Sequence, residues 1–243
     1  MFQEGGKGAS VRHINSSDNR GAGACIRGQC RGLPDGTRVK IDVVDYLMGR
    51  LRKLLSSATS SLCEHQPAIS GQLRALAGSL ADELLTMLRE RNGFYALESA
   101  LHVFPSRSSQ QEIGLEDWNE NTLWRNEYKG LAEGCLFFAE DVFGGQFCIK
   151  DERVYTFDPE TGALDYLADD IEGWAKAIIS DYEALTGYPL AHQWQERNGQ
   201  LPAKKRLLPK IPFVAGGEFV LDNLYLSDVI DGMRFRASHY TEL

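Results

Sequence analysis

The sequence has no long hydrophobic run, and this absence bears first on membranes and export. No stretch of its 243 residues approaches the roughly 18 consecutive apolar residues of a transmembrane helix. Residues 1–20 are polar, with glycine and serine but without the apolar centre of a signal peptide. The five cysteines include no Cys-x-x-Cys pair, and their odd number favours a reducing compartment over a disulfide framework. We therefore expect a cytoplasmic protein without a membrane partner.

The motifs by which many enzymes and metal proteins are recognised are also missing. The five histidines form neither His-x-x-x-His nor His-Glu-x-x-His, and there is no Gly-x-Ser-x-Gly elbow, P-loop or Gly-x-Gly-x-x-Gly. Paired carboxylates occur, of which Glu140-Asp141 is the least ordinary, but acid-rich surfaces produce such pairs by chance. We expect no enzyme activity, metal or cofactor. The alternative is an enzyme in which Glu140, Asp141 or His192 converge in one pocket.

Charge is plentiful but unevenly distributed, and this bears on the kind of partner. The formal net charge is −8, yet residues 1–93 hold 13 basic and 9 acidic side chains, a net of +4. Residues 112–183 hold 18 acidic and 5 basic side chains, a net of −13. Such a field repels nucleic acid and attracts basic proteins. We expect a protein partner and no nucleic acid, unless the acids only keep the surface soluble.

Composition and periodicity predict three regions. Residues 1–23 have almost no aliphatic side chains and are predicted to be disordered. Residues 24–69 are predicted to form a strand–helix extension, with Val39, Ile41 and Val43 on one face of the strand. Residues 70–243 are predicted to form the main domain.

The order of elements predicts the fold class. We expect a helix capped by Ser70, a helix over 116–128, strands near 135–139, 146–149, 153–157, 164–167 and 218–221, and helices after Asp169-Asp170, Leu190 and Ser227. A loop punctuated by prolines carries the basic cluster Lys204, Lys205, Arg206 and Lys210. Helices around an antiparallel meander are typical of an α+β protein, with a central, mostly antiparallel sheet flanked by helices.

Candidate binding residues lie in the acidic part of the chain. Trp118 and Trp124 are six residues apart, which places them on different faces of a helix at about 100° per residue. We expect Trp124 in the core and Trp118 as an exposed anchor for a partner; the alternative places both in the core. The candidate partner-binding residues are Trp118, Glu120, Glu140, Asp141, Asp169, Asp170 and Glu172.

A series of segments gives the chain a family resemblance. In order they are FYALESALHVFP (94–105), WN (118–119), LWR (123–125), FFAEDVFGGQF (137–147), FDPETG (157–162), the Trp174 helix, LTGYPLAH (185–192) and MRFRA (233–237). Over about residues 70–240 this series resembles the SUKH superfamily, the Smi/Knr-like proteins.

The resemblance implies a function as well as a fold. It implies an α+β domain with a largely antiparallel sheet and, in bacteria, an immunity protein that binds a polymorphic or contact-delivered toxin. No enzymatic activity is characteristic of the family, and the acidic region fits a basic toxin such as a nuclease. A non-enzymatic scaffold or regulatory protein, as among the fungal relatives, is the alternative.

One segment departs from the family pattern. The family subgroup continues beyond the MRFRA segment into a Leu-Pro-Asp-Gly turn and a final strand, whereas here a similar turn and strand occupy residues 33–43. The hypothesis is a rearranged gene, in which Val39, Ile41 and Val43 would pair beside the C-terminal half of the sheet. Coincidence is the alternative.

Overall fold

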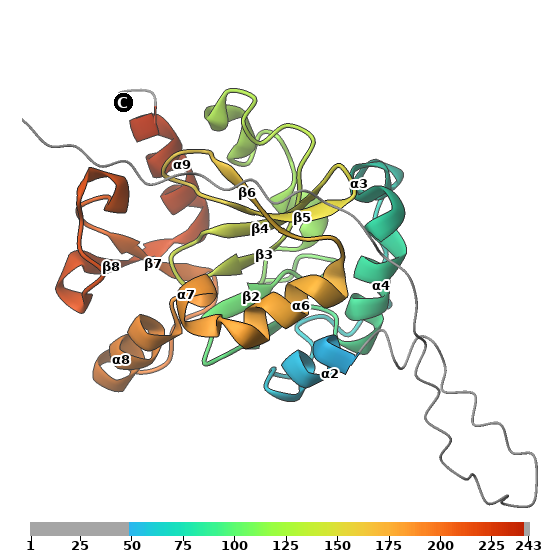
Figure 1. The fold of residues 1–243 in the computed structure, drawn as a ribbon, viewed down its shortest axis with the longest axis horizontal. Coiled ribbons are helices and arrows are strands. Elements are labelled where there is room, and N and C mark those ends of the chain that lie inside the picture. Colours follow the sequence, from blue (N-terminus) through green and yellow to red (C-terminus); the bar gives the residue numbers. More distant parts are fainter. Residues whose placement is uncertain (1–48, 241–243) are drawn as a thin grey trace, which may run out of the picture. The chain divides into compact units, whose positions relative to one another are not determined.

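The computed structural model describes residues 49–240 (Figure 1). Its helices are α2 (Gly49–Ser56), α3 (Gly71–Ala77), α4 (Ala81–Glu90), α5 (Leu115–Trp118), α6 (Ile171–Ser180), α7 (Tyr182–Thr186), α8 (Tyr188–Asn198) and α9 (Val229–Tyr240). Its strands are β1 (Phe94–Ala96), β2 (Leu101–Val103), β3 (Leu136–Asp141), β4 (Gln146–Lys150), β5 (Arg153–Phe157), β6 (Leu164–Ala168), β7 (Lys205–Pro209) and β8 (Leu224–Asp228). Within this part of the chain, no helix has both the length and the apolar character needed to cross a membrane.

Six strands form one sheet in the order β1-β2-β3-β4-β5-β6, and every neighbouring pair is antiparallel. Strands β7 and β8 form a separate antiparallel pair, which α9 contacts. The expectation of an α+β fold with an antiparallel sheet flanked by helices is confirmed.

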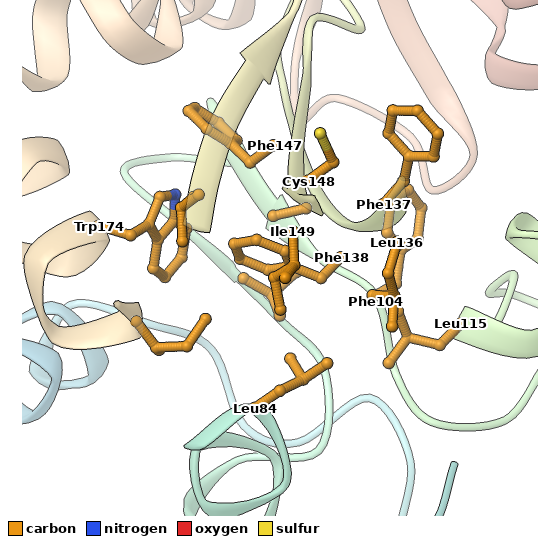
Figure 2. Packing of buried hydrophobic residues seen from close by; sticks show 14 of the residues in the cluster. Leu84, Phe104, Leu115, Leu136, Phe137, Phe138, Phe147, Cys148, Ile149 and Trp174 are labelled. Atoms are coloured by element: carbon orange, nitrogen blue, oxygen red, sulfur yellow. The ribbon is translucent and has the colours of Figure 1, made fainter. Parts of the chain in front are cut away.

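Aromatic side chains fill both faces of the main sheet. Successive residues of a strand point to opposite faces, so Phe137 and Phe138 of β3 enter different halves of the core (Figure 2). The Phe138 ring packs at 5.1 Å from Trp174 of α6, and the Phe137 ring packs at 5.0 Å from Trp124. All residues of β3 except the last are buried, which explains the continuous apolar run in its sequence.

Local signals in the sequence set several element boundaries. The Ser70 side chain accepts a hydrogen bond from the Leu73 backbone N–H and caps α3, as predicted. Asp170 Oδ1 accepts from the Gly173 N–H and caps α6 in the same way. The leucines of α2 belong to the same core as the main sheet, and α2 packs against α6. Residues 49–56 are therefore built into the fold.

Two predicted elements are wrong. The helix expected over 116–128 is interrupted, because the Asn119 side chain binds the Phe137 backbone and Trp124 adopts an extended φ of −158°. Only α5 and a short 3-10 turn, Arg125–Tyr128, are helical there. In place of the strand expected at 218–221, residues 219–220 form a bend and Leu221 begins a 3-10 turn, Leu221–Asn223. The strands β7 and β8 lie on either side of this segment. The predicted disorder at 1–23 and the predicted strand at 39–43 lie outside the described residues.

Candidate partner-binding site

The loop between β7 and β8 exposes an unusual amount of apolar surface. We call residues 211–220 the 211–220 loop. Phe219 is 63% exposed, and Ile211, Val214 and Val220 are exposed as well. Asn223 fixes the loop, because its Oδ1 accepts from the Ile211 N–H at 2.9 Å and its Nδ2 donates to the Ile211 carbonyl at 3.0 Å. A cluster of exposed large apolar side chains on an ordered loop is typical of a protein interaction site.

A cavity of 280 Å³ lies beside this loop. Its lining comes from the loop, the β3–β4 turn, the β5–β6 turn, α7 and α9. The apolar part of the wall includes Phe143, Leu185, Phe213, Val214 and Phe219, and the polar part includes Asp141, Gln146, Asp158, Glu160 and Arg236. Phe213 and Phe219 stack with their ring centres 3.9 Å apart. The cavity therefore combines an aromatic wall with three carboxylates and one guanidinium.

The β3–β4 turn places Asp141 at the cavity. Asp141 Oδ1 accepts backbone hydrogen bonds from Phe143 at 2.7 Å and from Gly145 at 2.8 Å, which closes a tight turn. Burial raises the pKa of the Asp141 carboxyl from 3.8 to about 7, in spite of these hydrogen bonds and the nearby Arg236. Gly187 approaches the same turn so closely that a Cβ on it would lie 2.3 Å from the Phe143 ring.

The β5–β6 turn places Glu160 at the cavity. Asp158 Oδ1 accepts from the Glu160 backbone N–H at 2.8 Å, and Glu160 Oε2 accepts from the Val214 N–H at 3.0 Å. This second bond joins the turn to the 211–220 loop. Glu160 is only 7% exposed, and its Oε1 has no hydrogen-bond partner among the described residues. A buried carboxylate oxygen without a partner is unusual, because desolvating it is costly.

A buried ion pair connects the two sheets beneath the site. Arg206 of β7 places its Nη2 2.8 Å from Glu140 Oε1 of β3, at an angle that makes the contact an ion pair rather than a hydrogen bond. The imidazole Nδ1 of His102 lies 3.0 Å from the same oxygen. Burial lowers the pKa of His102, so we assign a neutral ring that donates from Nδ1. Arg206 also lies over the Tyr95 ring, at 5.6 Å.

The charge state of Glu140 follows from these neighbours. Burial by itself would raise its pKa, but the Arg206 guanidinium and the His102 hydrogen bond together hold the pKa below its ordinary value. Glu140 is thus a buried carboxylate with three partners, since Gln146 Nε2 also donates to its Oε2 at 3.3 Å. Arg206, which the sequence groups with an exposed basic cluster, is in fact 1% exposed. The ion pair positions β7, and with it the start of the 211–220 loop.

The prediction that Trp118 is an exposed anchor is wrong. Its side chain is fully buried, its ring stacks on Phe104 at 4.8 Å, and its Nε1 donates to Gln146 Oε1 at 2.9 Å. Trp124 is buried as expected, with its ring 5.4 Å from Trp118. The helical-wheel argument fails because the chain between the two tryptophans is not a continuous helix.

The predicted acidic residues are not gathered in one place. Glu120 and Asp169 are exposed, and Asp169 Oδ1 lies 3.6 Å from Arg153 Nε. Asp170 is half-buried as the cap of α6, and Glu172 accepts from the backbone N–H groups of Arg50 and Leu51 at the start of α2. Glu140 is buried and Asp141 lines the cavity. Of the seven candidates, only Asp141 contributes to the cavity wall.

The alternative enzyme site is not assembled either. His192 of α8 pairs with Glu98 at 2.7 Å and with Glu196 at 3.5 Å, rather than with Glu140 or Asp141. Between residues 49 and 240, no group of three or more His, Cys, Asp or Glu side chains is placed to hold a metal ion.

Sequence reasoning missed the residues that form the cavity and its rim, above all Glu160, Val214 and Phe219. A signal was present, because residues 211–220 contain five large apolar side chains although Pro209, Pro212 and Gly216-Gly217 mark the stretch as a loop. Apolar side chains in a loop have no strand or helix neighbour to cover them, which favours exposure.

Comparisons with known proteins give two similarities. No family model matches the chain. A stretch of 39 residues, 16% of the chain, is 51% identical to the DNA-entry nuclease of Bacillus subtilis strain 168 and spans 26% of that protein, about a quarter of its length. The crystal structure of Atu4351 from Agrobacterium tumefaciens is similar to this one with a TM-score of 0.47 and 12% identity, over 75% of this chain and 86% of that chain.

Proposed function

We propose that the chain is an immunity protein, which neutralises a polymorphic or contact-delivered toxin in the cytoplasm by binding it directly. The observation that carries the proposal is the exposed 211–220 loop beside a cavity lined by three carboxylates. A large exposed aromatic at the rim of a pocket is the usual geometry of an interface anchor. The family resemblance of residues 70–240 to SUKH proteins supports the same function.

Charge supports a basic partner. Residues 112–183 carry a net charge of −13 and include Asp141, Asp158 and Glu160 of the cavity. An acidic field of this kind speeds association with a basic surface, while the apolar loop supplies contacts that slow dissociation. The partner surface would therefore be basic, with an apolar patch at its centre.

The toxin class that fits best is a nuclease. Nucleases bind the phosphate backbone and need a basic surface to do so, and an acidic protein that covers this surface blocks the substrate. The 39-residue similarity to a DNA-entry nuclease supports this choice.

Purified components test the proposal. The partner is first captured from native lysate at moderate salt and identified, and its toxin domain is then purified and assayed for DNA cleavage. We expect cleavage to stop when this protein reaches one equivalent of the toxin. A captured partner whose activity is unchanged at a large excess would contradict the proposal and favour the scaffold or regulatory alternative.

A further inference from the structure

We infer that the cavity beside the 211–220 loop receives an arginine side chain from the bound partner, with Glu160 as its counter-ion. The inference rests on the proposed function for the identity of the partner. The site itself, however, is defined by residues of this chain and can be tested without the partner.

Glu160 supplies the strongest argument. Its Oε2 is already engaged by the Val214 N–H, whereas its Oε1 is buried without any partner in residues 49–240. Burying a carboxylate oxygen without a hydrogen-bond partner costs free energy. A cationic donor that enters the cavity and binds this oxygen would offset the cost. Glu160 lines the cavity, and because one of its oxygens is held by the loop, the position of the whole carboxylate is fixed.

The balance of charge in the cavity wall favours a cation. Asp158 and Glu160, together with Asp141, whose raised pKa leaves it partly protonated near neutral pH, line the cavity with a single guanidinium, that of Arg236. Arg236 is held by other groups, because Nη1 donates to the Phe143 carbonyl at 2.7 Å, Nε donates to the Gly232 carbonyl at 3.1 Å and Nη2 donates to the Met233 sulfur at 3.5 Å. No carboxylate oxygen of the described chain lies within ion-pair distance of Arg236.

Size and wall chemistry select an arginine. A cavity of 280 Å³ lies at the lower end of the range for ligand pockets, and it suits one side chain better than a cofactor. Phe213 and Phe219 form a stacked pair, and Phe143 meets both rings edge-on. A guanidinium stacks on aromatic faces and is less strongly hydrated than an ammonium, so it enters an aromatic pocket at lower cost.

The test uses N-acetyl-arginine amide as the probe and N-acetyl-citrulline amide as its neutral, nearly isosteric control. Both are titrated into isotopically labelled protein, and backbone amide shifts are followed by NMR. We expect the arginine probe to bind with roughly millimolar affinity and to shift the amides of Phe143, Gly145 and Val214. The citrulline probe should leave these amides unshifted. Equal shifts with both probes, or no saturable shift with arginine, would overturn the inference.

Matched variants assign the counter-ion. Glu160→Gln keeps an acceptor for the Val214 N–H but removes the charge, and we expect it to weaken arginine binding by about tenfold or more. Glu90→Gln removes an exposed charge that does not line the cavity and should leave binding unchanged. Unchanged binding in Glu160→Gln would overturn the inference. If the protein neutralises the toxin but does not bind the arginine probe, this inference is wrong and the proposed function stands. If the protein binds the probe but does not neutralise the toxin, the proposed function is wrong.

Discussion

Arg206 and Glu140 join the two sheets of the fold through a contact of 2.8 Å between two side chains that are each 1% exposed. Arg206 belongs to β7, which leads into the 211–220 loop, and Glu140 belongs to β3, directly before the cavity residue Asp141. The pair therefore fixes the distance between the two parts of the candidate site. Its energetic consequences can be measured.

Removing one partner of this pair should be costly. In Arg206→Met the Glu140 carboxylate stays buried without its counter-ion, and we expect the free energy of unfolding to fall by about 3–5 kcal/mol. Urea denaturation followed by circular dichroism measures the change. The double variant Arg206→Met with Glu140→Met should lose less than Arg206→Met alone. A single variant as stable as the wild type would contradict the role of the pair.

The pH dependence of stability should reveal Asp141. Its pKa is about 7 in the folded protein and has an ordinary value of 3.8. Between these values the folded state binds more protons than the unfolded state, so stability decreases as pH rises. The side chain at position 141 does not titrate in Asp141→Asn. The charged neighbours Glu140 and Arg236 are present in both proteins, so the difference between the two pH profiles reports on Asp141. We expect the wild type to lose stability relative to Asp141→Asn between about pH 4 and about pH 7, and to change little relative to it above pH 7. A constant difference in urea midpoint over this range would argue against the raised pKa.

Gly187 should be sensitive to substitution because of the Phe143 ring. It has a φ of +67°, and an added Cβ would lie 2.3 Å from Phe143 and 2.8 Å from Val142. Gly216 lies in the same left-handed region, with a φ of +88° and a ψ of 15°, but has open space around it. We expect Gly216→Ala to cost about 1–2 kcal/mol through backbone strain, and Gly187→Ala to cost clearly more. Equal losses of stability in thermal or urea unfolding would show that the contact with Phe143 is unimportant.

Phe219 should matter for binding more than for stability. The side chain is 63% exposed, but its ring contacts Phe213 and Phe143, so Phe219→Ser should lower the free energy of unfolding by about 1 kcal/mol. Because Phe219 is the proposed interface anchor, Phe219→Ser should weaken binding by about 2 kcal/mol or more, measured by calorimetry with the purified toxin domain. Tyr166→Ser removes a similarly exposed aromatic, at 55%, from β6 and serves as the control. Equal affinities of the two variants would exclude Phe219 as the anchor.

Local chemistry in the sequence was sufficient to predict most of the sheet and several helix starts. The β4–β5 hairpin, the Ser70 cap and the Asp170 cap each depend on residues close to one another in the chain. The continuous apolar run of β3 likewise reports burial on both faces. These signals are local, so one sequence contains them in full.

The candidate site could not be predicted in the same way, because its parts come together through distant contacts. The sequence groups Arg206 with a basic cluster that would be solvent-exposed, whereas in the fold Arg206 of β7 pairs with Glu140 of β3. The sequence predicts Trp118 as an exposed anchor, whereas in the fold its indole donates to Gln146, 28 residues away in the chain. Glu160 has significance only because Val214, 54 residues later, engages one of its oxygens.

The most direct test of the account is protection of cells that express the identified toxin domain. Survival is counted with co-expressed wild-type protein, with Phe219→Ser and with Tyr166→Ser, after equal protein levels have been verified by blotting. The account predicts that the wild type and Tyr166→Ser protect, whereas Phe219→Ser loses most of the protection. Death of cells in all three cases, or equal protection by all three proteins, would contradict it.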